Sequence, residues 1–214
     1  MSPVRGGGGT TDGSSAWLAE MEEKYLSPTF ALIEGASLRE VIDYLRCGTE
    51  RVEMMSAEEA VTRIEHDVDL VGLGSVREFV FAVEAIGMTF AVPAVLRDLS
   101  KEGRCLSLTL GNEGVNSFRY AVGGDVVAYE QDAMDVIAPL RPNDERWNPS
   151  WNEALAGLQR EQATGEHLLM LTEKITGVAP EASWISEPLA TVRVPSSRFS
   201  ENPAAWDAPR IDHE

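Results

Sequence analysis

The sequence predicts an α+β fold in which helices pack on a mixed, partly antiparallel sheet that includes a β-meander. Three observations predict it. Apolar and polar residues alternate in several short segments, which is typical of strands. Capped amphipathic segments between them are typical of helices. Three strand-like segments follow one another between residues 104 and 130 with no helix between them, so at least this part of the sheet is expected to be antiparallel.

The first residues and the first strand differ sharply in composition. Residues 1–16 are rich in Gly, Ser and Thr and have no apolar anchor, so we expect a flexible tail. The apolar spacing from Trp17 to Tyr25 predicts a short amphipathic helix. The apolar run 28–33, closed by Gly35, predicts a strand.

Two capping boxes mark the beginnings of the next two helices. Ser37 is followed three residues later by Glu40, and Ser56 is followed by Glu59 at the same spacing. In such a box the serine hydroxyl accepts from the later amide, and the carboxylate accepts from the amide of the serine. The pattern therefore predicts a helix after each serine.

The strongest strand signal lies at 77–84. Both faces of this segment are apolar, which predicts a strand in the middle of the sheet. Residues 69–74 before it predict a turn or a short strand. Pro93 occupies a first-turn position, and a helix is expected from there to residue 101.

The second half begins with the meander, whose last two strands are joined by the tight turn Gly123-Gly124. The expected elements are strands at 104–110, 116–122 and 125–130, a loop at 140–151, helices at 151–162 and 166–175, a helical turn at 180–185 and a strand at 189–194.

We expect one domain, 17–194, followed by a second flexible tail at 195–214, which has three prolines and no periodicity. Cys47 and Cys105 are too few for a secreted disulfide scaffold and are expected to be reduced. No apolar run reaches the ~18 residues of a membrane span, and the first 15 residues do not resemble a secretory signal. A cytoplasmic protein is expected, without contact with a membrane.

The chain is acidic, with 18 Lys+Arg against 35 Asp+Glu among 214 residues and a formal charge of −17. Segment 1–16 is neutral and 195–214 carries −2, so the expected domain carries −15. This sign argues against direct nucleic-acid binding and favours solubility or a partner protein with a basic surface. An acidic nucleic-acid-mimic decoy is an alternative, although the acidic residues are dispersed.

Four segments stand out through their order and spacing: Tyr25-Leu26-Ser27-Pro28-Thr29-Phe30 before Gly35; Phe81-Ala82-Val83-Glu84 with Gly87; residues 117–128; and residues 171–178 with Trp184-Ile185. Through them the chain resembles an uncharacterised domain family of actinobacterial proteins. Members of that family often have Phe-Asp where this chain has Tyr129-Glu130. The resemblance implies a bacterial protein with one α+β domain and both tails as additions, and it supplies no cofactor and no catalytic residue.

Glu84 and Arg119 are the candidates for a ligand site or an ion pair. Glu84 ends an apolar strand, in phase with Val80 and Ala82, so its carboxyl must be paired or have a raised pKa. Arg119 is expected on another strand of the same sheet. A pair between them is either structural or lines a cleft for a small enzyme or ligand sensor.

Arg141, Arg146, Trp147 and Trp151 form the candidate partner-binding loop. Trp and Arg are enriched at interface hot spots, although such residues also commonly close the end of a core. We call these four residues the Trp–Arg loop.

No convergent catalytic set is visible, so catalytic residues are expected to be none and an enzyme is less expected than a binding protein. The cluster Glu65-His66-Asp67 with Asp69 is the densest set of possible metal ligands, but successive residues at a helix end point in different directions. We expect no metal and no cofactor. The sequence ranks a non-enzymatic, immunity-like or regulatory protein-binding module first, the Glu84/Arg119 ligand site second and the decoy third.

Overall fold

The computed structural model describes residues 17, 28–46, 51–63, 65, 67–111, 116–130, 140–141, 143–151 and 165–199. The tail at 1–16, the expected helices after Trp17 and Trp151, and the residues after 199 lie outside the described residues. The domain boundaries therefore stay a prediction.

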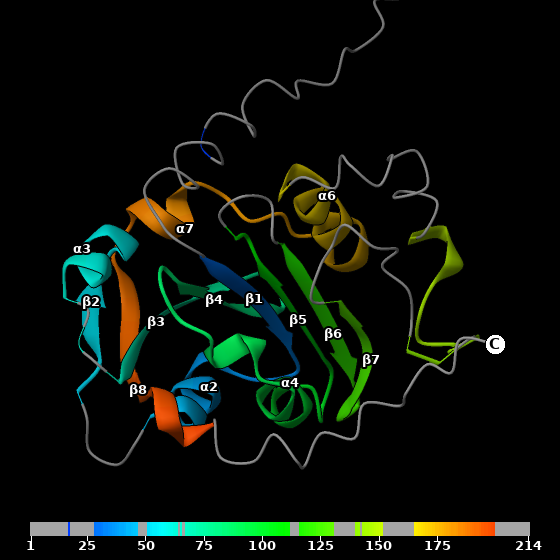
Figure 1. Ribbon diagram of the computed structural model, residues 1–214, viewed down its shortest axis with the longest axis horizontal. Helices are drawn as coiled ribbons and strands as arrows, with labels where there is room; N and C mark the ends of the chain where they lie inside the picture. Colours follow the sequence, from blue (N-terminus) through cyan, green and yellow to red (C-terminus); the bar gives the residue numbers. More distant parts are fainter. Residues whose placement is uncertain are drawn as a thin grey trace, which may run out of the picture.

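Eight strands form one antiparallel sheet in the order β2-β8-β3-β4-β1-β5-β6-β7 (Figure 1). The prediction of an α+β fold with a β5–β6–β7 meander is confirmed. Every pairing between neighbouring strands is antiparallel, so the sheet is more uniform than the mixed sheet expected. The strands are β1 (Thr29–Glu34), β2 (Glu53–Met55), β3 (Val68–Val76), β4 (Phe79–Glu84), β5 (Arg104–Thr109), β6 (Ser117–Val122), β7 (Asp125–Glu130) and β8 (Leu189–Pro195).

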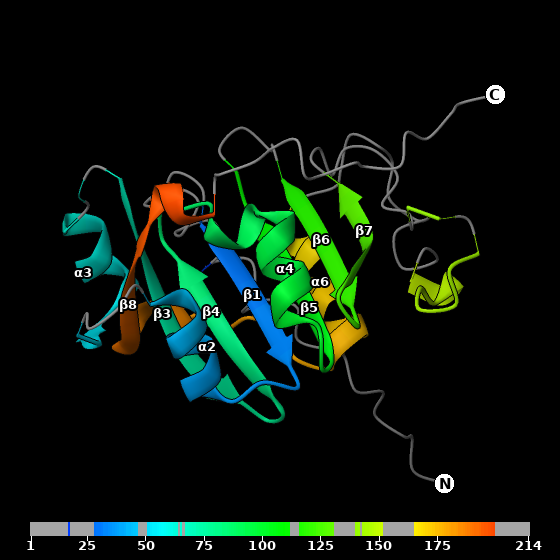
Figure 2. The ribbon, with the colours of Figure 1, turned by 90° about the horizontal axis from the view of Figure 1, so that it is seen from below.

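Helices cover both faces of the sheet (Figures 1 and 2). One core, between the sheet and α6 with α7, contains Phe30, Phe81 and Trp184. The opposite core, between the sheet and α2 with α4, contains Ile33, Val80 and other buried residues. The helices are α2 (Leu38–Leu45), α3 (Ala57–Thr62), η1 (Thr89–Ala91), α4 (Pro93–Leu99), α6 (Gly165–Thr176), α7 (Ser183–Ser186) and η4 (Ser196–Arg198).

Burial on both faces explains the apolar runs of the middle strands. All six residues of β4 are buried, and β4 lies between β3 and β1, in the interior of the sheet as expected. Its odd and even positions contribute to the two different cores.

Local signals begin and end the helices as predicted. Both capping boxes are formed, at Ser37 for α2 and at Ser56 for α3. Pro93 occupies the first turn of α4, and Gly177 follows α6 with a φ of 72°, a conformation that glycine adopts without steric cost. None of the helices described is long and apolar enough to cross a membrane.

The differences from the expected elements lie near the β2 edge. The segment expected as a turn or short strand is the nine-residue strand β3. Strand β2 was not predicted, because it has three residues, two of them exposed, and its hydrogen bonds come from β8, far away in the sequence.

Candidate ligand-binding site

A row of polar side chains crosses one end of the sheet on the α4 face. In register, Glu84 of β4 lies opposite Thr29 of β1, and Thr29 lies opposite Thr109 of β5. Thr109 in turn lies opposite Ser117 of β6. All four are buried, so this end of an otherwise apolar face is polar across four neighbouring strands.

A second polar row lies next to the first on the same face. Ser107 of β5 lies opposite Arg119 of β6, and Arg119 lies opposite Tyr129 of β7. The guanidinium carbon of Arg119 is 5.2 Å from the centroid of the Tyr129 ring, a cation–π distance. Nη1 of Arg119 donates to the Thr109 hydroxyl at 3.4 Å, which connects the two rows.

Glu84 is held by the turn that follows its strand. Its two carboxyl oxygens accept from the backbone N–H groups of Thr89 (3.1 Å) and Phe90 (3.2 Å), at the beginning of η1. The side chain is 0% exposed. Burial raises its pKa to about 7, with the two N–H groups acting in the opposite direction and Asp69 adding to the rise.

On the β3 side, Glu84 lies close to the carboxylate of Asp69 and to the backbone at Gly87. The Asp69 carboxylate accepts from the hydroxyls of Thr89 (3.1 Å) and Ser196 (2.9 Å). A Cβ on Gly87 would lie 2.9 Å from an oxygen of Glu84 and 3.3 Å from the carboxyl carbon of Asp69. Glycine is therefore required there for the chain to pass both carboxyl groups.

Arg119 is a buried cation that contacts no carboxylate among the described residues. It is 3% exposed, and burial lowers the pKa of its guanidinium, against the opposing effects of Tyr129 and Glu84. Its Nε–H has no hydrogen-bond partner in the part of the chain that the structure describes, and neither does the Ser107 hydroxyl, which is 0% exposed. Unfilled buried polar groups of this kind are rare in folded proteins and costly.

The structure places Glu84 and Arg119 on one sheet face, but not in a direct ion pair. Strands β1 and β5 lie between their strands, and the hydroxyls of Thr29 and Thr109, 3.0 Å apart, lie between the two groups. Glu84 is satisfied by backbone amides, whereas Arg119 contacts the Thr109 hydroxyl and Tyr129. The expected pair is thus replaced by a chain of polar groups.

The Trp–Arg loop is divided between core and surface. Trp147 is 3% exposed and packs edge-on against Phe118 and Tyr120. Trp151 is partly buried and packs edge-on against Tyr120, with the ring centroids 5.7 Å apart. The tryptophans therefore close the end of the α6-side core.

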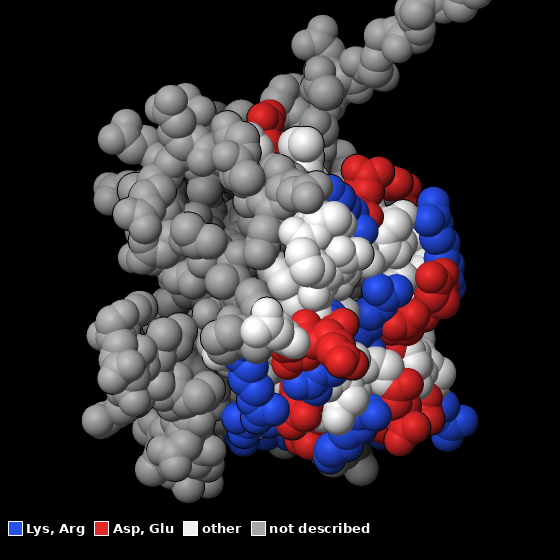
Figure 3. All heavy atoms as spheres, turned by 90° about the vertical axis from the view of Figure 1, so that its right-hand side faces the viewer, with Lys and Arg blue, Asp and Glu red and all other residues white. Residues whose placement is uncertain are grey.

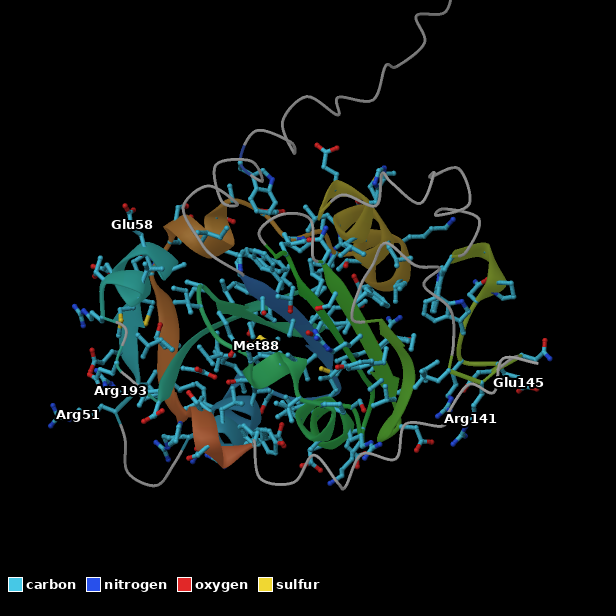
Figure 4. All side chains as sticks on the ribbon, viewed as in Figure 1. Arg51, Glu58, Met88, Arg141, Glu145 and Arg193 are labelled. Carbon is cyan, nitrogen blue, oxygen red and sulfur yellow. The ribbon has the colours of Figure 1, made fainter. Side chains whose placement is uncertain are left out.

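The arginines of this loop lie outside that core. Arg146 is fixed by Asp144 and Asp125 at 2.8 and 3.0 Å, and these carboxylates raise the pKa of Arg146 above its ordinary value. Arg141 is exposed at the molecular edge beyond β7, near Glu145 (Figure 4). The partner-binding role of this loop stays a prediction, and Arg141 is its accessible part.

The possible metal ligands near residue 67 do not converge in the described residues. Glu65 pairs with Arg193 at 2.7 Å, Asp69 is occupied by hydroxyls, and His66 lies outside the described residues. No group of three or more possible ligands occurs among the residues that the structure describes. A pocket of about 280 Å³ is lined by Glu65, Asp69 and Ile86 among others, and none of its lining residues belongs to the two polar rows.

Sequence reasoning missed four members of the site: Thr29, Ser107, Thr109 and Tyr129. The available signal was their phase, because Ser107 and Thr109 alternate with leucines on a strand whose other face is apolar. The register that joins them to Arg119 depends on strand order, which no local pattern contains.

Comparison with known proteins adds no assignment. No family model, no curated protein and no solved structure matches this chain. The resemblance to an actinobacterial family therefore stays a prediction, and the function has to be argued from the site.

Proposed function

We propose that the protein is a cytoplasmic small-molecule-binding protein, a sensor or small enzyme, that holds an anionic ligand at Arg119. One observation carries the proposal. The Nε–H of the buried Arg119 guanidinium has no hydrogen-bond partner among the described residues, and neither has the hydroxyl of Ser107 on the neighbouring strand. Burying a cation without a partner is expensive. An anion in contact with Arg119 would remove that cost.

The surrounding residues support ligand binding over a purely structural role. A structural arginine of this sheet has acceptors: Arg104 contacts Glu34 at 2.6 Å and donates to the carbonyl of Ile175. Arg119 has two uncharged partners instead, the Thr109 hydroxyl and Tyr129. No negatively charged acceptor among the described residues contacts Arg119, which favours a ligand-binding site over a structural ion pair.

Glu84 would give this site acid–base capacity. A carboxyl with a pKa of about 7 exchanges its proton near neutral pH. Because its oxygens are engaged by backbone amides, a role in sensing the charge of the site is better supported than direct attack on a substrate. Arg119 is the group that we place in contact with the ligand.

The test is thermal unfolding of the protein with a panel of small anions at constant ionic strength. We expect at least one anion to raise the Tm of the wild type and of Arg39→Met, and to leave the Tm of Arg119→Met unchanged. Arg39 is the matched control, because it is exposed on α2 and only loosely paired with Asp43 at 3.7 Å. Equal stabilisation of both variants would contradict the proposal.

A protein-binding role has a separate support at the β2 edge. Met54 of β2 is 65% exposed and Val52 is 39% exposed, and β2 is the terminal strand of the sheet. An edge strand can add an extended segment of a partner. If this edge binds a partner protein, Met54→Lys should abolish binding of that partner in a pull-down. The control Met170→Lys, at another exposed methionine, should bind it as the wild type does.

The decoy alternative has less support. On the described part of the face in Figure 3, acidic and basic side chains are interspersed and do not form an acidic array. A basic partner remains compatible with the net charge of −17.

A further inference from the structure

We infer that the ligand presents a single carboxylate to Arg119 and Ser107, an inference that rests on the proposed function and specifies its ligand class. The two residues are directly opposite each other on β6 and β5. Each is more than nine-tenths buried, and each has a polar atom that no described residue engages.

The Nε–H of Arg119 is the donor available to an acceptor. Nη1 of Arg119 is engaged by Thr109, and the Tyr129 ring lies against the guanidinium. The Nε–H remains without a described partner. It lies in the guanidinium plane, where a carboxylate oxygen can accept it. One carboxylate oxygen would accept from Nε–H and the other from the Ser107 hydroxyl.

The charge balance favours a monoanion. Arg119 is the cation of the two polar rows, and the acidic group whose charge reaches it is Glu84, behind Thr29 and Thr109. One negative charge neutralises Arg119. A dianion such as a phosphate monoester would leave a second negative charge buried on the side of Glu84, at a high desolvation cost.

The experiment compares ligand classes by titration calorimetry at one ionic strength. The probes are sodium acetate, butyrate and benzoate on one side, and inorganic phosphate and methyl phosphate on the other. We expect at least one carboxylate to bind more tightly than both phosphates. Arg119→Lys keeps the charge but loses the planar edge, so it should weaken that carboxylate more than tenfold.

Ser107→Ala tests the second donor. It should weaken the same carboxylate about tenfold, the usual effect of one hydrogen bond to a charged group. Ser75→Ala is the matched control, since Ser75 is an exposed serine on β3, and it should bind as the wild type does. Unchanged affinity in Ser107→Ala would overturn the assignment of that residue.

An NMR titration of the wild type tests ligand binding at Arg119 even if a variant does not fold. The Nε–H signal of Arg119 in a ¹⁵N–¹H NMR spectrum, assigned by its loss in Arg119→Lys, should move during carboxylate titration. If phosphate moves it and binds more tightly than every carboxylate, the ligand class is wrong and the proposed function stands. If none of the five anions binds through Arg119, both fail.

Discussion

At the scale of single residues, the described part of the molecule buries the carboxyl group of Glu84 and the guanidinium of Arg119 without joining them. Glu84 is satisfied by two backbone amides, whereas Arg119 retains a donor that no described residue uses. The two groups therefore carry different costs. Ionisation of Glu84 is opposed by burial, while Arg119 keeps its charge at every physiological pH.

The pH dependence of stability should report Glu84. The folded protein keeps this proton up to about pH 7, whereas the unfolded chain releases it near 4.5. The raised pKa therefore makes the wild type lose stability as pH rises from 4.5 to 7, by about 3 kcal/mol in total. Glu84→Gln should flatten that part of the profile, measured by urea unfolding from pH 4.5 to 8.

The exposed Glu78→Gln serves as the control for this profile and should leave its slope as in the wild type. The comparison uses the slope and not the absolute stability. The two backbone N–H groups bind different oxygens of Glu84, and in Glu84→Gln one of these oxygens is replaced by an NH2 group, which is a donor. A wild-type profile that is flat between pH 4.5 and 7 would contradict the assignment.

Replacing Arg119 should not weaken the protein in the absence of ligand. Arg119→Met removes a buried cation that no described carboxylate contacts, so we expect the free energy of unfolding to stay level or to rise by about 1–3 kcal/mol. Arg104→Met provides the contrast, because it leaves Glu34 without its partner and should be destabilising. Guanidinium unfolding measures both, and a larger loss in Arg119→Met than in Arg104→Met would show a structural role.

At the scale of elements, close approaches between strands depend on small residues. A Cβ on Gly103 would lie 2.5 Å from the carbonyl oxygen of Glu34, and one on Gly35 would lie 2.6 Å from that of Glu102. The end of β1 and the beginning of β5 can meet only because both positions are glycine. The ring of Phe81 likewise lies over Gly74 of the neighbouring strand.

Gly74→Ala should destabilise the β3–β4 pair. The new Cβ would lie 2.3 Å from the Phe81 ring, and that ring is stacked on Trp184 with centroids 4.1 Å apart, so it has little room to move. We expect a loss of about 1–3 kcal/mol in urea unfolding. Ser75→Ala, one position later and exposed, should change stability by less than about 0.5 kcal/mol.

Elements with strong local signals were predicted well, and those defined by distant partners were not. Capping boxes predicted α2 and α3. Apolar runs predicted β1 and β4, alternation predicted β5 and β6, and the Gly123-Gly124 turn predicted the return strand β7. Strand β2 has no such pattern, since its pairing with β8 defines it. The same reason limited the site: phase placed Glu84 and Arg119 on one face, but only strand order shows that β1 and β5 separate them.

At the scale of the whole molecule, the sheet is held together by long-range pairings. β8, from residues 189–195, is the neighbour of both β2 and β3. Arg198 after it donates to the carbonyls of Tyr44 and Leu45 at the end of α2. The last described residues therefore connect the sheet to α2, one of the helices on its α4 side.

Shortening the chain tests this dependence. A chain ending at Phe199 should keep the wild-type fold, whereas one ending at Glu187 loses β8, leaves β2 without its described neighbour and exposes β3. Near-ultraviolet circular dichroism and NMR dispersion should be native-like for the first and lost for the second. A native spectrum from the shorter chain would show that the fold does not depend on β8.

The position of β8 also has a consequence for biosynthesis. A chain leaving the ribosome presents β2 and β3 more than a hundred residues before the strand that must lie between them. Until β8 emerges, β3 has one open edge and β2 has no sheet to join, while the neighbours on the other side, β3, β4, β1 and β5, can already pair. The open edge of β3 is then the surface most exposed to misassociation, and the sheet can be completed only after β8 has emerged.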